Sequence, residues 1–259
     1  CSQSSHYKTS ITATPLMDVD KVVAEAKAAK EKGATRICLG AAWREVRLSL
    51  QFDRVLEMIR SISQLGVEVC CCLGMLNEEA ARRLEEAGLT AYNQNLDTSE
   101  KFYKEIVTTR TYQDRLNTLD IIKKTKITTC CGGILGLGET QEDRIELLHT
   151  LANREPYPDS LPFNFLVPIP GTPFADKLRL ETTEIIRTIA TARITMPRAM
   201  VRISAGRLEL SFYEQALCFL AGANSIFFGD KLLTTPNPST DVDEQMFAKL
   251  GLEKRPPHK

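Results

Sequence analysis

Cysteines in apolar, strand-like segments are the side chains of this sequence with the clearest capacity for chemistry. Beyond the first residue they form a set of seven: Cys38, Cys70, Cys71, Cys72, Cys130, Cys131 and Cys218. Neighbours on a strand point to opposite faces, so adjacent cysteines are poorly placed for disulfides. A reduced, intracellular chain whose thiolates bind zinc or an iron–sulfur centre is the better interpretation. A mature lipoprotein that begins at Cys1 is the weaker alternative, because it leaves the other cysteines unexplained.

Side-chain alternation predicts which thiols share one face of a sheet. In the segment 67–72, Val69 and Cys71 fall on the apolar face that should meet helices. Cys70 and Cys72 then fall on the opposite, inward face. A slip of one residue in this register would exchange the two sets.

Three other expected strands bring thiols and guanidinium groups to the inward face. Cys38 and Arg36 alternate with an isoleucine, and Arg202 lies between a valine and an isoleucine. Cys130 and Cys131 are adjacent, so one of them must also point inward. A buried guanidinium is costly unless it meets an anion or a ligand.

A lone free cysteine is most often a small buried hydrophobe, and barrel interiors are normally filled by Val, Ile and Leu. Inward cysteines on three strands, with inward arginines and with Asn93, Asn95 and Asn164, favour a metal centre instead. Three cysteines and one arginine suit zinc poorly, because its usual fourth ligand is His or Cys. None of the three histidines falls on these strands.

These side chains need a scaffold, and the sequence predicts one in which strands alternate with helix-sized segments. The expected strands are 35–40, 67–73, 89–93, 127–131, 162–167, 199–204 and 224–228. Such alternation indicates an α/β fold with a parallel sheet, and the number of units favours a (β/α)8 barrel. We expect residues 1–230 to form the barrel, with its first strand before Cys1, and residues 231–259 to form a C-terminal surface tail.

The composition excludes several classes of protein. The 259 residues are 43% hydrophobic and 25% charged, which is typical of globular chains. Basic and acidic residues number 33 each, so the zero net charge gives no reason to expect a nucleic-acid partner. No uninterrupted apolar run approaches the roughly 18 residues that a membrane span needs.

Two loop segments carry further polar or flexible groups. The glycine-rich stretch 132–139 follows an expected strand, and its glycines could let a ligand approach the backbone. A plain glycine-rich turn is about equally consistent with it. Residues 92–98 end another strand with consecutive polar groups, which could bind a ligand at the carboxyl end of a barrel or simply form a capped turn.

Along nearly its whole length the chain resembles the biotin synthase family of radical S-adenosylmethionine (SAM) enzymes, which fold as (β/α)8 barrels. The similar segments are long and specific: TRICLGAAWR, EVCCCLG, YNQNLDTS, TTRTYQDRL, CCGGILGLGET, NFLVPIPGTP, VRISAGR and CFLAGANSIFFGDKLLTTPNP. One departure is Gln94, where the family's motif has histidine; glutamine still donates and accepts hydrogen bonds, so we expect a modest effect.

The resemblance implies two iron–sulfur centres. Cys1 corresponds to the third cysteine of the family's CxxxCxxC loop, which binds a 4Fe–4S cluster, and the two earlier cysteines are absent here. The implied ligands of a second, 2Fe–2S cluster are Cys38, Cys70, Cys130 and Arg202. Arg36 is implied to orient Arg202, and the remaining cysteines to pack.

The resemblance also implies binding residues for small molecules. The residues implied for SAM are Ala41, Trp43, Asn95, Asp97, Arg115 and Ile134. Asn93 and Asn164 are implied to bind the ureido ring of dethiobiotin, because an amide side chain offers both a donor and an acceptor.

The implied activity is insertion of sulfur into dethiobiotin to form biotin, the last step of biotin biosynthesis. No protein side chain need act as a general base, because the radical chemistry belongs to the cofactors. The family also implies a flavodoxin- or ferredoxin-type electron donor, a homodimer, and a cytoplasmic location, or a mitochondrial one in a eukaryote. Two alternatives remain open: a related radical SAM enzyme with another substrate, and an inactive fragment that cannot cleave SAM because two cluster cysteines are absent.

Overall fold

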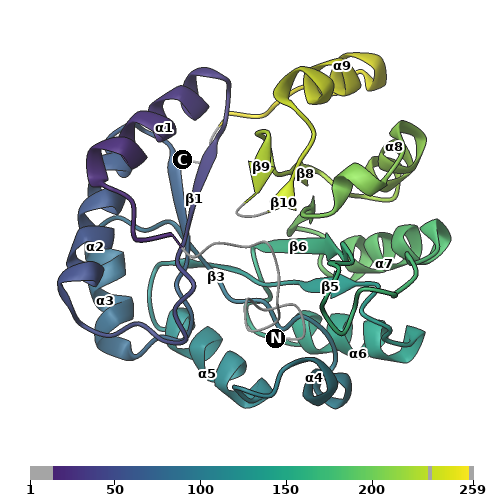
Figure 1. Ribbon diagram of the computed structural model, residues 1–259, viewed down its shortest axis with the longest axis horizontal. Coiled ribbons are helices and arrows are strands. Elements are labelled where there is room, and N and C mark those ends of the chain that lie inside the picture. Colours follow the sequence, from purple (N-terminus) through teal and green to yellow (C-terminus); the bar gives the residue numbers. More distant parts are fainter. Residues whose placement is uncertain (1–13, 233–234, 257–259) are drawn as a thin grey trace. The chain divides into compact units, whose positions relative to one another are not determined.

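The computed structural model describes residues 14–232 and 235–256 (Figure 1). Within these residues the chain divides into two compact units. The N-terminal unit holds residues 14–94, 115–130 and those from 247 onward, and the C-terminal unit holds 95–114 and 131–246. Each unit has its own run of parallel strands with helices between them.

In the N-terminal unit, four strands pair in parallel in the order β1-β2-β3-β4, and a helix separates each strand from the next along the chain. Figure 1 shows α1, α2 and α3 (purple to blue) along one face of β1 and β2. The elements are α1 (Val19–Glu31), β1 (Arg36–Gly40), α2 (Leu50–Ser63), β2 (Glu68–Cys72), α3 (Glu78–Glu86), β3 (Ala91–Asn93), most of α5 (Tyr112–Lys123) and β4 (Thr128–Cys130).

Helix α2 forms the main cover of this sheet because its apolar residues recur every three or four positions. Its buried side chains are Phe52, Val55, Leu56, Met58, Ile59 and Ile62. At its start the Ser49 hydroxyl accepts a hydrogen bond from the Phe52 amide at 3.3 Å. The helix side of β2 and β3 supplies Val69, Cys71 and Tyr92 to the same core. The strand period therefore sends every second residue of β2 into this core and the others to the opposite face.

In the C-terminal unit, strands β5 to β8 pair in parallel in chain order. Capping boxes start two of its helices: Thr140 with Asp143 at α6, and Ser211 with Glu214 at α8. The elements are α4 (Glu100–Ile106), β5 (Gly133–Leu135), α6 (Gln141–Ala152), β6 (Ser160–Phe165), α7 (Thr182–Thr195), β7 (Met200–Ile203), the 3-10 turn η1 (Arg207–Glu209), α8 (Phe212–Leu220), β8 (Ser225–Ile226), β9 (Lys231–Leu232), β10 (Thr235–Pro236) and most of α9 (Thr240–Leu250).

The predicted α/β class, with parallel strands separated by helices, is confirmed. Each expected strand has a counterpart, although most are shorter than the apolar runs that predicted them. Within residues 14–230, α4 and the strand β5 inside the glycine-rich stretch were not expected. No helix among the described residues is long and apolar enough to cross a membrane.

The C-terminal segment differs from the surface tail that the sequence suggested. Residues 240–250 form α9, and Asp243 and Met246 on this helix are buried. The polar, proline-containing composition of 231–239 indicated a loop, but the buried ion pair of Asp243 with Arg207 holds the segment on the C-terminal unit. An ion pair between residues 36 positions apart leaves no local sequence pattern.

Candidate functional site: a cluster of three thiols

Cys38, Cys70 and Cys130 meet on the face of the N-terminal sheet that lies opposite the helices. Cys38 and Cys70 are direct neighbours across β1 and β2. Cys70 and Cys130 pack around Ala91, whose small side chain lies between them on β3. Hydrogen bonds to Cys130 and then to Cys38, together with burial, raise the pKa of the Cys70 thiol well above its ordinary value. Cys70 therefore contacts both Cys38 and Cys130.

The other four cysteines of the described chain are Cys71, Cys72, Cys131 and Cys218. Cys71 is fully buried in the core under α2, and burial raises the pKa of its thiol. Cys131 and Cys218 are also buried, whereas Cys72 is exposed. The predicted alternation along β2 is confirmed, and of the adjacent pair it is Cys130 that joins Cys70. Cys1, the expected 4Fe–4S ligand, lies outside the described residues.

An ion pair lies beside the thiols. Arg36 Nε donates to Glu68 Oε2 at 2.5 Å, and both side chains are largely buried. Burial acts to lower the pKa of Arg36, but Glu68, with smaller effects of Cys70 and Cys130, raises it overall. The Nη1 group of Arg36 is buried and has no hydrogen-bond partner within the described chain. An unpaired buried donor of this kind suits an anionic group bound next to the cysteines.

Asn93, the expected substrate contact, lies at the same cluster. Its Nδ2 is 3.3 Å from the Sγ of Cys130 and 3.4 Å from the Cys130 carbonyl oxygen. The two residues are direct partners across β3 and β4. The amide that should bind substrate is thus in contact with a thiol that should bind a cluster.

The loop after β1, which carries Ala41 and Trp43, is held by the turn after β2. The Ala41 amide donates to the Cys72 carbonyl at 3.0 Å. Gly74 has a φ of +89°, and a β-carbon there would lie 2.5 Å from the Trp43 carbonyl oxygen. The buried Tyr92 hydroxyl donates to the Gly74 carbonyl at 2.6 Å and accepts from the Leu73 amide at 3.3 Å. Tyr92 therefore positions the turn on which this loop rests, a role that sequence alone did not indicate.

We expect Tyr92→Phe to lower the free energy of unfolding by about 1–3 kcal/mol, because it leaves the buried Gly74 carbonyl and Leu73 amide without their partner. Urea denaturation measures this change. Tyr157→Phe is the matched control, since that hydroxyl bonds only Arg198 near the surface. Equal losses in the two variants would contradict the positioning role of Tyr92.

In the C-terminal unit, several expected SAM and substrate residues lie close together. Asn95 Oδ1 accepts from the Gly132 amide at 3.1 Å, and the Asp97 carbonyl accepts from the Ile134 amide at 2.8 Å. Ile134 in turn pairs with Asn164 across β5 and β6. Asp97 has a φ of +70°, which is uncommon for a residue other than glycine and can mark a functional site. Arg115, the remaining expected SAM residue, is half-buried on α5 of the N-terminal unit.

The first two glycines of the stretch 132–139 serve packing. A β-carbon at Gly132 would lie 2.0 Å from the Pro162 carbonyl oxygen, and one at Gly133 would lie 2.5 Å from a methyl carbon of Leu147. At these two positions the chain itself fills the room that a ligand could otherwise use. The side chain of Ile134, by contrast, is only partly buried.

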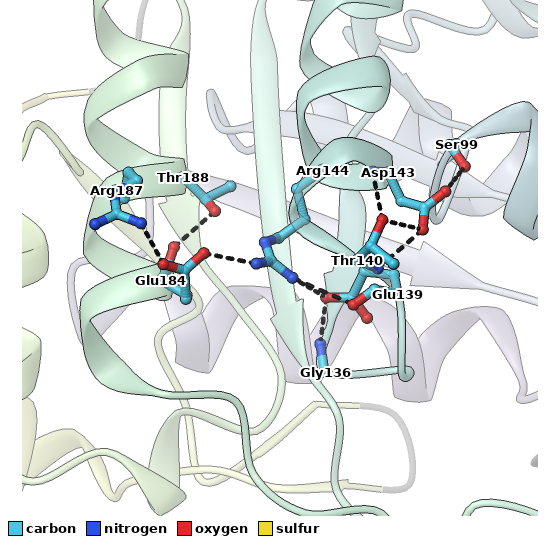
Figure 2. Close-up of polar contacts among 9 residues, drawn as sticks. All are labelled: Ser99, Gly136, Glu139, Thr140, Asp143, Arg144, Glu184, Arg187 and Thr188. Carbon is cyan, nitrogen blue, oxygen red and sulfur yellow. Dashed lines mark hydrogen bonds and ion pairs between the residues drawn. The ribbon is translucent and has the colours of Figure 1, made fainter.

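A charged network fixes the far end of this stretch (Figure 2). Glu139 Oε1 accepts from the Gly136 amide at 2.9 Å and from Arg144 Nη1 at 3.1 Å. Arg144 also contacts Glu184 of α7 at 2.6 Å. Glu139 and Arg144 are further residues that the sequence reasoning missed, because no local pattern links them to Glu184 of α7.

Arg202 faces away from the apolar neighbours of β7, as predicted. Its Nε donates to Ser225 Oγ at 2.9 Å, and its guanidinium carbon lies 5.0 Å from the centre of the Phe227 ring. These two contacts fix one edge and one face of the guanidinium. Its two terminal nitrogens form no hydrogen bond with the described chain.

Comparisons with known proteins agree with this arrangement. Residues 1–151 match the model of the Radical SAM superfamily, and residues 162–253 match that of the Biotin and Thiamin Synthesis associated domain. In fold, the chain is similar to methylornithine synthase, with a TM-score of 0.74 and 17% identity over 97% of this chain and 77% of that one. The FeFe-hydrogenase maturase HydG from Carboxydothermus hydrogenoformans is similar with a TM-score of 0.73 and 18% identity, over 94% of this chain and 60% of that one.

These matches define a radical SAM enzyme, which uses an iron–sulfur cluster and SAM. The chain is 58% identical to biotin synthase of Chlamydia pneumoniae, over 99% of this chain and 77% of the relative. It is 55% identical to the mitochondrial biotin synthase of Arabidopsis thaliana, over 99% of this chain and 68% of the relative. The chain belongs to the biotin synthase family.

Proposed function

We propose that this chain converts dethiobiotin to biotin, with Cys38, Cys70, Cys130 and Arg202 holding a 2Fe–2S cluster that supplies the sulfur. The contact between Asn93 Nδ2 and Cys130 Sγ at 3.3 Å carries the proposal. It joins a residue suited to a cyclic urea with a residue suited to iron. Arg202 enters the set through the family motif VRISAGR and through its terminal nitrogens, which form no hydrogen bond with the described chain.

The thiols fit a two-iron cluster better than a single metal ion. Among the described residues, no three His, Cys, Asp or Glu side chains converge to hold one ion. Cys70 instead contacts Cys38 and Cys130 separately, and a cluster with two irons takes its ligands at two centres. The buried, unpaired Nη1 of Arg36 adds a donor for the negative charge of such a group.

When bound, SAM and a 4Fe–4S cluster would supply a 5′-deoxyadenosyl radical in each of two rounds, and a 2Fe–2S cluster would supply sulfide and accept the electrons released as two C–S bonds replace two C–H bonds. The chain's own residues bind, orient and exclude water. We propose that Asn93 and Asn164 hold the ureido ring. The SAM molecule is held by Ala41, Trp43, Asn95, Asp97, Arg115, Ile134 and the cluster at Cys1.

The chemistry also requires an electron in each round, and we propose a flavodoxin- or ferredoxin-type donor for it. A homodimer is proposed from the family. The proposed location is the cytoplasm, or the mitochondrion in a eukaryotic source, in keeping with the mitochondrial relative.

The test is to reconstitute the full gene product anaerobically and supply dethiobiotin, SAM and a reductant. We expect biotin together with 5′-deoxyadenosine. Asn164→Ala should raise the KM for dethiobiotin about tenfold, because one ureido hydrogen-bond pair is lost, while Asn153→Ala on the exposed end of α6 should not. Formation of 5′-deoxyadenosine without biotin would favour a related enzyme with another substrate, and neither product would favour an inactive chain.

A further inference from the structure

Arg207 and Asp243 form an ion pair in the C-terminal unit that the proposed reaction does not use directly. Both side chains are fully buried. Arg207 Nη1 and Nη2 donate to the two carboxylate oxygens of Asp243 at 2.7 and 2.8 Å, in a two-pronged contact. Gln215 Oε1 accepts a further bond from Arg207 Nη1 at 3.0 Å. A buried pair of this kind is costly to desolvate, so its contribution to stability alone explains its presence poorly.

The pair acts on the segment that follows β8. Arg207 Nη2 donates to the Phe227 carbonyl at 3.1 Å. The same carbonyl accepts from Asn237 Nδ2 at 3.0 Å, and Asn237 also donates to the Gly229 carbonyl at 2.8 Å. Residues 227–229 are thus fixed through their backbone by side chains from η1 and from the segment before α9.

The segment that these bonds fix carries the contacts of Arg202. Phe227 places its ring 5.0 Å from the Arg202 guanidinium carbon, and Ser225, two residues earlier, binds Arg202 Nε at 2.9 Å. Arg207 itself lies five residues beyond Arg202, after a turn at Gly206 with a φ of +83°. One buried arginine is therefore linked, through Phe227, to the orientation of another.

We propose that Arg207 and Asp243 are positioning residues for Arg202: they hold residues 225–229 so that the Arg202 guanidinium is fixed before the cluster binds. This inference rests on the proposed role of Arg202 as a cluster ligand. The inference assigns α9 a role at the site, because Asp243 lies on this helix. Arg207 and Asp243 then support a cluster ligand without touching the cluster themselves. Such partners orient a ligand and are typically worth roughly tenfold or more in affinity or activity.

Asp243→Asn is the principal test, because it keeps the shape of the side chain and removes its charge. Phe227→Leu removes the ring over Arg202 and leaves the ion pair intact. Glu214→Gln is the matched control: it makes the same chemical change in a carboxylate that contacts Arg179, on α8 of the same unit. All are compared with the unchanged chain and with Arg202→Ala, by the visible spectrum of the reconstituted 2Fe–2S centre and by its rate of loss under reduction.

We expect Asp243→Asn and Phe227→Leu to lose the cluster about tenfold faster than the unchanged chain and to shift its spectrum in the direction of Arg202→Ala. Hydrogen exchange at 225–229 should rise in cluster-free Asp243→Asn, and Glu214→Gln should match the unchanged chain. If Arg202→Ala alters the spectrum and both test variants leave it unchanged, the positioning role is wrong and the proposed function stands. If the unchanged chain holds no such centre, the proposed function itself fails. Should Asp243→Asn fail to fold, Phe227→Leu decides alone.

Discussion

Cys70→Ala is expected to abolish the visible absorption of the 2Fe–2S cluster and to reduce biotin formation to the background of the assay. Cys70 is the thiol that contacts both Cys38 and Cys130, so its removal breaks the donor set at its centre. The adjacent thiol of Cys71 cannot replace it, because Cys71 points into the helix-side core. Iron and acid-labile sulfide per chain should fall together with the absorption.

Cys71→Ala is the control for this result, since it changes the adjacent residue on the same strand. We expect it to keep the cluster spectrum and to lose about 1 kcal/mol of the free energy of unfolding, the typical effect of one buried substitution. Loss of the spectrum in Cys71→Ala and its retention in Cys70→Ala would show that the register of β2 is wrong by one residue.

Gly132→Ala is expected to be the most destabilising of the substitutions considered for packing. The new β-carbon would lie 2.0 Å from the Pro162 carbonyl oxygen and 2.8 Å from its carbonyl carbon. These are backbone atoms of β6, so relief requires a shift of the strand. We expect a loss of about 3 kcal/mol or more in the free energy of unfolding, at the upper end for overpacking, measured by urea denaturation.

Gly66→Ala provides the contrast for Gly132→Ala. Gly66 has a φ of +75° but nothing within 4 Å of a β-carbon, so only the backbone conformation opposes the change. Its cost should be about 1–2 kcal/mol. A loss in Gly132→Ala no larger than that in Gly66→Ala would contradict the close strand packing at Gly132.

Periodicity predicted the scaffold because it follows from local geometry. The expected strand 67–73 corresponds to β2, and strict alternation along 67–72 separated Cys70 from Cys71. The same local reasoning could not tell which of Cys130 and Cys131 points inward, because two adjacent residues of the same kind give no alternation to follow. Packing decides it: Cys130 lies against Ala91 and Cys70.

Contacts between distant residues could not be predicted in this way. Arg207 and Asp243 lie 36 positions apart in the sequence, and only the fold buries them together. The glycines at 132 and 133 read as room for a ligand, whereas Pro162 and Leu147 fill that room. Likewise Glu139 and Arg144 gained their role only when α6 and α7 were brought side by side (Figure 2). The roles of Asn93 and Arg202 came from family resemblance, and the geometry added their neighbours.

The most direct test of the sulfur-donating role is to follow the sulfur itself. The 2Fe–2S centre of the full gene product would be rebuilt with heavy-isotope sulfide, freed of excess sulfide, and given one turnover with dethiobiotin and SAM. Mass spectrometry of the product then identifies the source of its sulfur. We predict biotin that carries the heavy isotope, with loss of the label from the protein; biotin with ordinary sulfur would contradict the assignment of Cys38, Cys70, Cys130 and Arg202 as holders of the sulfur donor.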